Sequence, residues 1–317
     1  MSYAQFGLIQ ATDFNTFVGG NPTTTANTLN ATWATGGGSA GYGQTPVGNV
    51  AVGNTVIATG QWNALVSNTA SAATHQGSSI TSVTAPTAGG TVTFLSAIPT
   101  NLSTIFSNRL NAATQGSTSS NTVTRGTTWS QILTFTHTAT FANGDAARYF
   151  FNAGGQIKMT CAHPNGTGIN LLMRDLAANV GTVTLSSPST GTVSIASTSY
   201  NGVTKIGGGG NTPTISPNSG YYGLTTSNTT VFTQTASTGP AGYLGTFIRF
   251  IARTNGTQGA NGDNGSVITV HTVWDQIPDG LVVSTGSATT MTIQAPETTN
   301  IANTWGAITL SGSVTGS

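Results

Sequence analysis

From residue 129 on, apolar and hydroxyl side chains alternate along the chain with a period of two. In LTFTHTATFA (133–142), Leu133 and Phe135 fall on one face, and the intervening threonines fall on the other. Successive side chains of a strand point to opposite faces, so this period predicts half-buried strands. We expect a mainly β protein whose C-terminal part resembles an antiparallel β-sandwich, with a smaller α-containing N-terminal region. Further short strands, bounded by Gly, Pro or Asn turns, are predicted at 182–187, 192–197, 221–226, 229–236, 244–253, 266–274, 280–286, 290–295 and 307–314.

The stretch 130–162 is predicted to form a long β-hairpin around an Asn-Gly-Asp turn at 143–145. Within it, Arg148 lies close in sequence to Asp145, and we expect the two side chains to form a buried or half-buried pair. Three consecutive aromatic residues come next, Tyr149, Phe150 and Phe151, so both faces of that strand should be covered.

The first part of the chain reads instead as short helices separated by glycine-rich loops. Asp13 can cap a turn that carries Phe14 and Phe17. The apolar spacing then predicts helices at 23–33, 60–74 and 101–113, and later one at 170–181 that ends at Gly181. We expect two domains: residues 1–128 as a helical, glycine-rich attachment region and residues 129–317 as the β domain, with a possible subdivision near 205–215.

Charge is scarce: 8 basic and 7 acidic residues make up 5% of the chain, against about 25% in an average soluble protein. Between Asp13 and Arg109 there is no Asp, Glu, Lys or Arg. Burying an ion is costly unless it is well paired, whereas hydroxyls and amides find partners more easily. The composition therefore favours a protein that packs against copies of itself or other subunits. The alternative is an exported β-protein with a hydroxyl-rich surface.

The same composition argues against several classes of partner. The basic residues are few and scattered, so we expect no nucleic-acid binding. No apolar run is long enough for a membrane span, and the N-terminus does not resemble a secretory signal. Cys161 is alone, which leaves no disulfide framework and argues against a cysteine metal site. We expect no cofactor and no metal.

Ionisable residues that could support catalysis are also sparse. His271, Asp275 and Asp279 form the best constellation, but no nucleophile motif accompanies them, so a strand ending in a turn is the preferred interpretation. We therefore expect no enzymatic activity. Other candidates considered, and interpreted as structural, are the paired acids Asp263, Asp275, Asp279 and Glu297 for glycoside hydrolysis, the loop 255–266 for calcium, the run GGGG at 207–210 for phosphate, and His75 and His163 for metal.

The stretch FANGDAARYFFNAGGQIKMT (141–160) resembles a segment of virion structural proteins of tailed bacteriophages, notably marine and cyanobacterial phages. Further pieces fit that resemblance in order: GYGQ (41–44), QWNAL (61–65), HQG (75–77), GYYGLTTSNTTVF (220–232) and NTWGAITLSG (303–312). The resemblance spans most of the chain and implies a particle component in a tail, neck or fibre, located in the virion. It supplies no active-site residues.

The first hypothesis is a structural subunit that associates with copies of itself, a homotrimer being favoured for a fibre, and with other virion proteins. Its core or interface anchors would be Trp33, Trp62, Trp129, Phe150, Phe151, Tyr221, Tyr222 and Trp305. The alternative is a receptor-binding or glycan-binding fibre tip, in which exposed Tyr221, Tyr222 and Trp274 contact host sugars. A cellular surface or filament protein is the third possibility.

Overall fold

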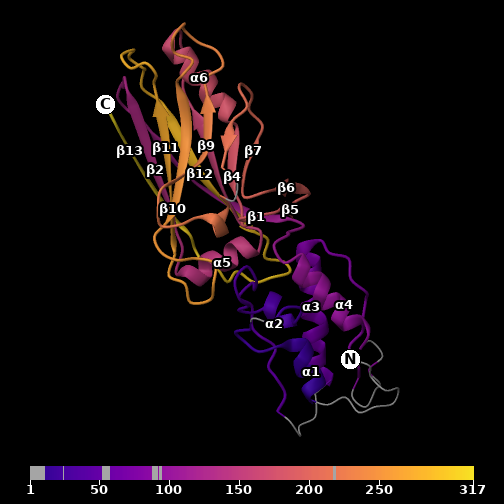
Figure 1. The fold of residues 1–317 in the computed structure, drawn as a ribbon. Coiled ribbons are helices and arrows are strands. Elements are labelled where there is room, and N and C mark those ends of the chain that lie inside the picture. The colour runs from indigo at the N-terminus through magenta and orange to yellow at the C-terminus, as the bar shows by residue number, and fades with distance from the viewer. Residues whose placement is uncertain (1–10, 24, 52–57, 88–91, 93–94, 217–218) are drawn as a thin grey trace.

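The computed structural model describes residues 11–23, 25–51, 58–87, 92, 95–216 and 219–317. The molecule is elongated, with helices at one end and two β-sheets at the other (Figure 1). The helix α5 lies where the two parts meet, and α6 lies at the far end of the sheets.

The N-terminal helices are short and pack around a shared apolar core. They are α1 (Ala11–Val18), α2 (Leu29–Thr32), a π-helical turn (Ala58–Trp62), α3 (Asn63–Gln76) and α4 (Ala97–Ser107). Phe14 of α1 meets Trp62 edge-on, with ring centroids 5.1 Å apart. Leu65 of α3 and Leu102 of α4 are buried in the same core. Packing must hold these helices, because their Thr, Asn and Ser residues compete for backbone hydrogen bonds.

The helix predicted at 23–33 is reduced to the single turn α2. Asn27 adopts a left-handed φ of 60°, and the hydroxyl of Thr23 accepts a hydrogen bond from the Thr25 backbone N–H at 3.1 Å. Such local turns compete with the helix and delay its start. The last turn forms as expected, since the Trp33 N–H donates to the Leu29 carbonyl at 2.8 Å.

The rest of the chain is a sandwich of two antiparallel sheets, which confirms the predicted fold class. The five-stranded sheet has the order β1-β12-β3-β4-β7, the six-stranded sheet has the order β13-β2-β11-β10-β9-β8, and β5 pairs with β6 in a separate ribbon. The strands are β1 (Gln115–Thr124), β2 (Ile132–Thr140), β3 (Gln156–Ala162), β4 (Thr182–Leu185), β5 (Val193–Ile195), β6 (Thr198–Tyr200), β7 (Val203–Ile206), β8 (Thr214–Ile215), β9 (Thr229–Thr235), β10 (Phe247–Thr254), β11 (Val267–Asp275), β12 (Ala288–Pro296) and β13 (Thr309–Gly316).

The inner faces of the two sheets form the core of the sandwich. A small apolar cavity of ≈ 20 Å³ between them is lined by Ile157 and Val183 of one sheet and by Phe250 and Val270 of the other. Most of the predicted strands form: 182–187, 229–236, 244–253, 266–274, 290–295 and 307–314 overlap β4, β9, β10, β11, β12 and β13 of the sandwich, and 192–197 contains β5 of the separate ribbon. The predicted helix at 170–181 is α6 (Ile169–Val180), and it ends at Gly181.

The hairpin predicted at 130–162 is wrong. β2 and β3 belong to different sheets, and the helix α5 (Gly144–Asn152) joins them. The Asn143 side chain caps this helix by accepting the Ala146 N–H at 2.8 Å. Ala147, Phe150 and Phe151 are then buried at helical spacing, so the aromatic run covers a helix face rather than the two faces of a strand.

Two other predicted strands are also corrected. Residues 221–226 begin with a 3₁₀ turn (Tyr221–Gly223) instead of a strand, and the Tyr221 ring stacks on Phe151 at 4.3 Å. In 280–286, Val283 makes an isolated bridge to Trp129, and no strand extends from it. Conversely, β1 was not predicted, because Ser, Thr and Asn occupy both of its faces and leave no apolar alternation.

Candidate functional site

Several buried polar side chains lie where the helices meet the sandwich, among them Gln44, His75, Gln76, Arg148, Asn152 and Glu297. We call this region the junction and define it by the segment 38–44, the end of α3, the helix α5 and the segment 297–305. It contains GYGQ, HQG and the start of NTWG, three of the sequence motifs described above, together with the NGDAARYFF stretch on α5. Residues far apart in the sequence therefore meet at one place.

Arg148 is the centre of the junction. Its side chain is fully buried and forms an ion pair with Asp145, one turn earlier on α5, with Nε–Oδ1 and Nη2–Oδ1 distances of 3.1 and 2.9 Å. Its other branch donates to the Ala40 carbonyl at 2.7 Å. The guanidinium also lies 4.8 Å from the centre of the Tyr149 ring. A planar fork can make all of these contacts at once, so Arg148 ties α5 to the segment 38–44.

Asn152 and Tyr149 of α5 also contact the segment 38–44. The Asn152 amide donates to the Gly41 carbonyl at 2.9 Å, and the Tyr222 hydroxyl donates to the Asn152 side-chain oxygen at 2.5 Å. Tyr149 covers Gly43, where the backbone has a φ of 69° and where an added Cβ would collide with the tyrosine ring. Glycine at this position meets both the left-handed φ and the close ring contact.

Tyr42 extends the network into the helices. Its hydroxyl donates to the Arg109 carbonyl at 2.9 Å and accepts from the Gln76 amide at 2.8 Å. Burial raises the pKa of Tyr42 well above its usual value, so it stays protonated and able to donate. On the opposite side, the Gln44 amide donates to the Ala302 carbonyl at 2.8 Å and accepts the Ala302 N–H at 2.9 Å.

The junction also contains a buried pair of a carboxylate and an imidazole. His75 Nδ1 lies 2.8 Å from Glu297 Oε1, and the two side chains are almost completely inaccessible to solvent. Burial alone would raise the pKa of Glu297, but hydrogen bonds from His75, Asn300 and Thr299 outweigh it and lower that pKa to about 2. Because 222 positions separate His75 from Glu297, no sequence pattern could have paired them.

All of the predicted anchors except Tyr222 are buried within the single chain. Phe150, Phe151, Tyr221 and Trp305 form one aromatic cluster beside the junction, with the Phe150 and Phe151 centroids 5.0 Å apart and edge-on. Trp33 and Trp62 belong to the core of the helices, and Trp129 meets Trp274 edge-on at 6.4 Å within the sandwich. Tyr222 and Tyr149 are half-buried at the junction.

The expectation of an exposed glycan-binding platform is wrong for the residues proposed. Tyr221 and Trp274 are fully buried, and the Tyr222 hydroxyl is engaged with Asn152. Aromatic rings recognise sugars by presenting an open face, and these rings are packed against other side chains.

The candidate catalytic residues do not converge on one site. His271 lies on the outer face of β11, where its Nδ1 contacts the Thr136 hydroxyl at 2.9 Å. Burial, together with Arg253, lowers the pKa of His271. Asp275 is four positions along the same strand, which places it roughly 13 Å away. Among the described residues, no group of three or more His, Cys, Asp or Glu side chains is arranged to hold a metal ion.

The other candidates have structural contacts of their own. Asp263 accepts the Ala260 N–H at 2.8 Å within its loop, and Asn264 accepts the Thr257 N–H at 3.1 Å. His163 contacts the Ser287 hydroxyl at 2.9 Å. Burial raises the pKa of the Cys161 thiol above its usual range, which makes the thiolate scarce.

Comparisons with protein-family models, curated proteins and solved structures gave no match to this chain. Across the described ranges, we find no helix with the length and apolar character needed to cross a membrane.

Proposed function

We propose that this chain is a structural subunit of a tailed-phage virion, built into a tail, neck or fibre. It associates with copies of itself, in a homotrimer if it forms a fibre, and with other virion proteins. The interfaces are large and uncharged. The assignment to a phage particle comes from the sequence resemblance, and the outer surface of the sandwich supports the assembly role.

The observation that carries the assembly role is the outer face of the five-stranded sheet. Threonine and serine hydroxyls line up there across neighbouring strands: Ser120 contacts Thr292 at 2.8 Å, and Thr122 contacts Thr290 at 2.8 Å. The second row continues through β3 and β4 at Thr160 and Thr182.

This face carries very little charge. Across the described strands β1, β12, β3 and β4, Lys158 is the single charged side chain, and it donates to the Gln294 side-chain oxygen at 3.3 Å. A face of paired hydroxyls loses water at a lower free-energy cost than a face of ions, and the hydroxyls can exchange hydrogen bonds with a second surface. A face of this kind suits broad contacts between subunits.

The junction supports the same role in another way. Arg148, Tyr42 and Gln44 connect the helices to the sandwich through buried hydrogen bonds. A subunit whose two parts are fixed in this way loses little conformational freedom when it assembles.

Immunogold labelling of purified phage particles with antibodies against the chain tests the placement in a virion. We expect label at one defined position on the particle. Label that stays entirely in the particle-free lysate would exclude a virion subunit.

Charge added to the hydroxyl face tests the assembly role. The double variant Thr122→Glu, Thr290→Glu should reduce self-association, because two ions would have to be desolvated in the contact. Thr226→Glu, in an exposed loop outside the sheets, is the matched control and should associate normally. Equal association of all three proteins would contradict the role given to this face.

A further inference from the structure

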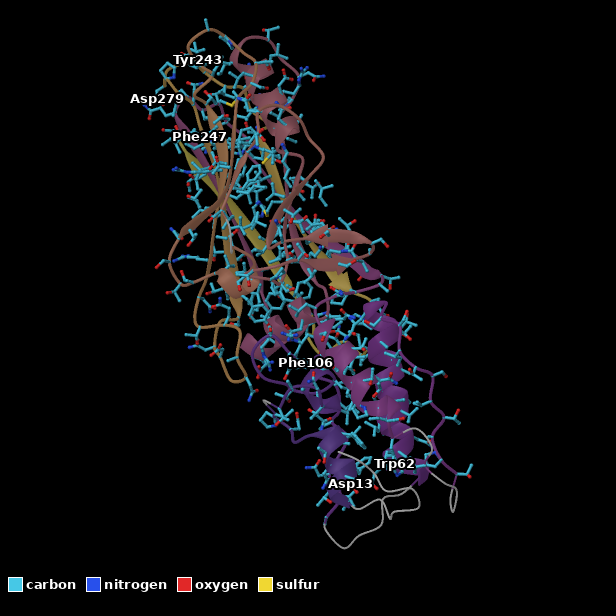
Figure 2. All side chains as sticks on the ribbon, turned by 45° about the vertical axis from the view of Figure 1, so that its right-hand side comes forward. Asp13, Trp62, Phe106, Tyr243, Phe247 and Asp279 are labelled. Carbon is cyan, nitrogen blue, oxygen red and sulfur yellow. The ribbon has the colours of Figure 1, made fainter. Side chains whose placement is uncertain are left out.

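The end of the sandwich farthest from the helices carries a cluster of exposed apolar side chains. Seven large hydrophobic residues in the described part of the chain are strongly exposed, and five of them lie here, so the exposure is concentrated and not scattered. Figure 2 labels Tyr243, Phe247 and Asp279 at this end, opposite Asp13 and Trp62. We call this cluster the distal tip; its members are Ile132, Leu244, Ile277, Leu281 and Val282.

Hydrogen bonds join the loops that carry the distal tip. The buried side chain of Gln276 donates to the Leu281 carbonyl at 2.9 Å and accepts the Leu281 N–H at 3.0 Å. The Thr246 hydroxyl accepts the Ile277 N–H at 3.1 Å, and the Gln276 N–H donates to the Gln131 carbonyl at 3.1 Å. The loops are therefore fixed with their apolar side chains outward, with Val282 62% exposed and Leu244 50% exposed.

Exposing a contiguous apolar patch has a free-energy cost of about 25 cal/mol for each Å² left in water. Large exposed patches on soluble proteins therefore mark interaction sites. The remaining question is which partner covers this one.

The charges at the rim of the distal tip point to a second copy. The Arg249 guanidinium lies over the Phe247 ring, with its carbon 5.1 Å from the ring centre. Asp279 lies in the loop that carries Ile277 and Leu281. Within the described residues, neither Arg249 nor Asp279 takes part in an ion pair. Asp275, at the end of β11, is a second acid at this rim: burial raises its pKa and Arg249 partly opposes that rise. A rim that has charges of both signs is complementary to itself across a two-fold axis.

We propose that two copies of the chain associate through the distal tip, which is a separate contact from the hydroxyl face. The apolar side chains of the two copies pack together, and Asp279 of each copy faces Arg249 of the other. The inference deepens the proposed function, on which it rests for the idea that the chain self-associates, and it names one surface that does so.

Sedimentation equilibrium of the full chain over a concentration series tests this contact. Val282→Ser and Leu244→Ser should each weaken the association by roughly tenfold in Kd, since each removes apolar area from the contact. The matched control is Ile206→Ser, at an exposed apolar residue on β7 outside the tip, and it should leave the tip contact unchanged.

A charge swap tests the pairing directly. Asp279→Arg alone and Arg249→Asp alone should each weaken the association, and the two together should restore it, because the pair is then re-formed with the signs exchanged. Circular dichroism melting of each variant verifies that it is folded, and the serine variants test the contact without altering any charge.

The outcomes separate this inference from the proposed function. If the Thr122→Glu, Thr290→Glu variant loses association while every tip variant keeps it, the tip contact is refuted and the assembly role stands. If the tip variants lose binding to a different component, such as a host-surface protein, and still self-associate, the homotypic contact is refuted. If only the tip variants lose association, the tip contact is supported and the role of the hydroxyl face is refuted.

Discussion

Replacing Arg148 with methionine should destabilise the protein more than any surface substitution. Methionine fills most of the buried volume, but the Ala40 carbonyl loses its 2.7 Å partner and Asp145 loses both of its contacts with the guanidinium. An unsatisfied buried carbonyl costs about 1–3 kcal/mol. Breaking a buried ion pair by removing one partner costs about 3–5 kcal/mol.

Asp145 is 28% exposed and can regain water, so the loss should fall below the sum of these values, at about 3 kcal/mol. The free energy of unfolding from urea titrations, followed by both far-ultraviolet circular dichroism and tryptophan fluorescence, measures it. Arg148→Lys keeps the charge but not the planar fork, and should lose an intermediate amount. A change of under about 0.5 kcal/mol for the methionine variant, typical of an ordinary surface site, would refute the role assigned to Arg148.

Three further predictions concern the core and the acid response. Burial lowers the pKa of His137 to about 4. The stability that neutral His137 contributes is therefore full above its unfolded pKa near 6.5 and is lost as the pH falls to about 4, and it amounts to at most about 3 kcal/mol. The urea midpoints at pH 7 and pH 4.5 should differ less for His137→Gln than for the unmodified chain. Glu297→Gln should cost about 2 kcal/mol of stability at pH 7, because it weakens the buried contact with His75. It should also reduce the loss of stability between pH 4.5 and about 2, where the unmodified carboxylate takes up its proton. Identical acid unfolding of the two proteins would contradict this. Phe151→Ala should cost about 3–5 kcal/mol in thermal or chemical unfolding, because it leaves a cavity against Tyr221, and a loss below about 1 kcal/mol would place Phe151 outside the core.

The sandwich could be predicted from the sequence where one face of a strand is apolar and the other is not. β2 and β12 have this pattern, and their alternation identifies them. β1 could not be found in this way, because it is an edge strand whose exposed residues are mostly Ser, Thr and Asn. It pairs antiparallel with β12, and the hydroxyl contacts between the two strands join residues 168 or more positions apart.

The error at α5 has a local physical cause. Asn143-Gly144 is a strong signal for a hairpin turn, yet asparagine is equally good as a helix N-cap. In the folded protein the segment is a helix, in which Ala146, Ala147 and Phe150 are buried together at helical spacing. The apolar core against which they pack includes residues from distant parts of the chain, so the local sequence could not decide between a strand and a helix.

The junction could be predicted only in part. The contact between Asp145 and Arg148 was expected from their proximity in sequence, and the structure brings them together on one helix face. The partners of Arg148 in the segment 38–44 were not expected, nor was the pairing of His75 with Glu297, because the sequence contains no pattern that relates them. The short motifs GYGQ and HQG both lie at the junction, but the contact between them, from Gln76 to Tyr42, could be identified only in the folded chain.

The mass of the full chain in solution, measured by sedimentation equilibrium from micromolar to millimolar concentration, tests the central claim most directly. The account predicts masses that rise to a small multiple of 31.9 kDa and that change little between about 0.05 and about 0.5 M salt, because screening weakens contacts between ions and leaves uncharged contacts intact. A single-copy mass at every concentration, or an association that salt abolishes, would contradict it.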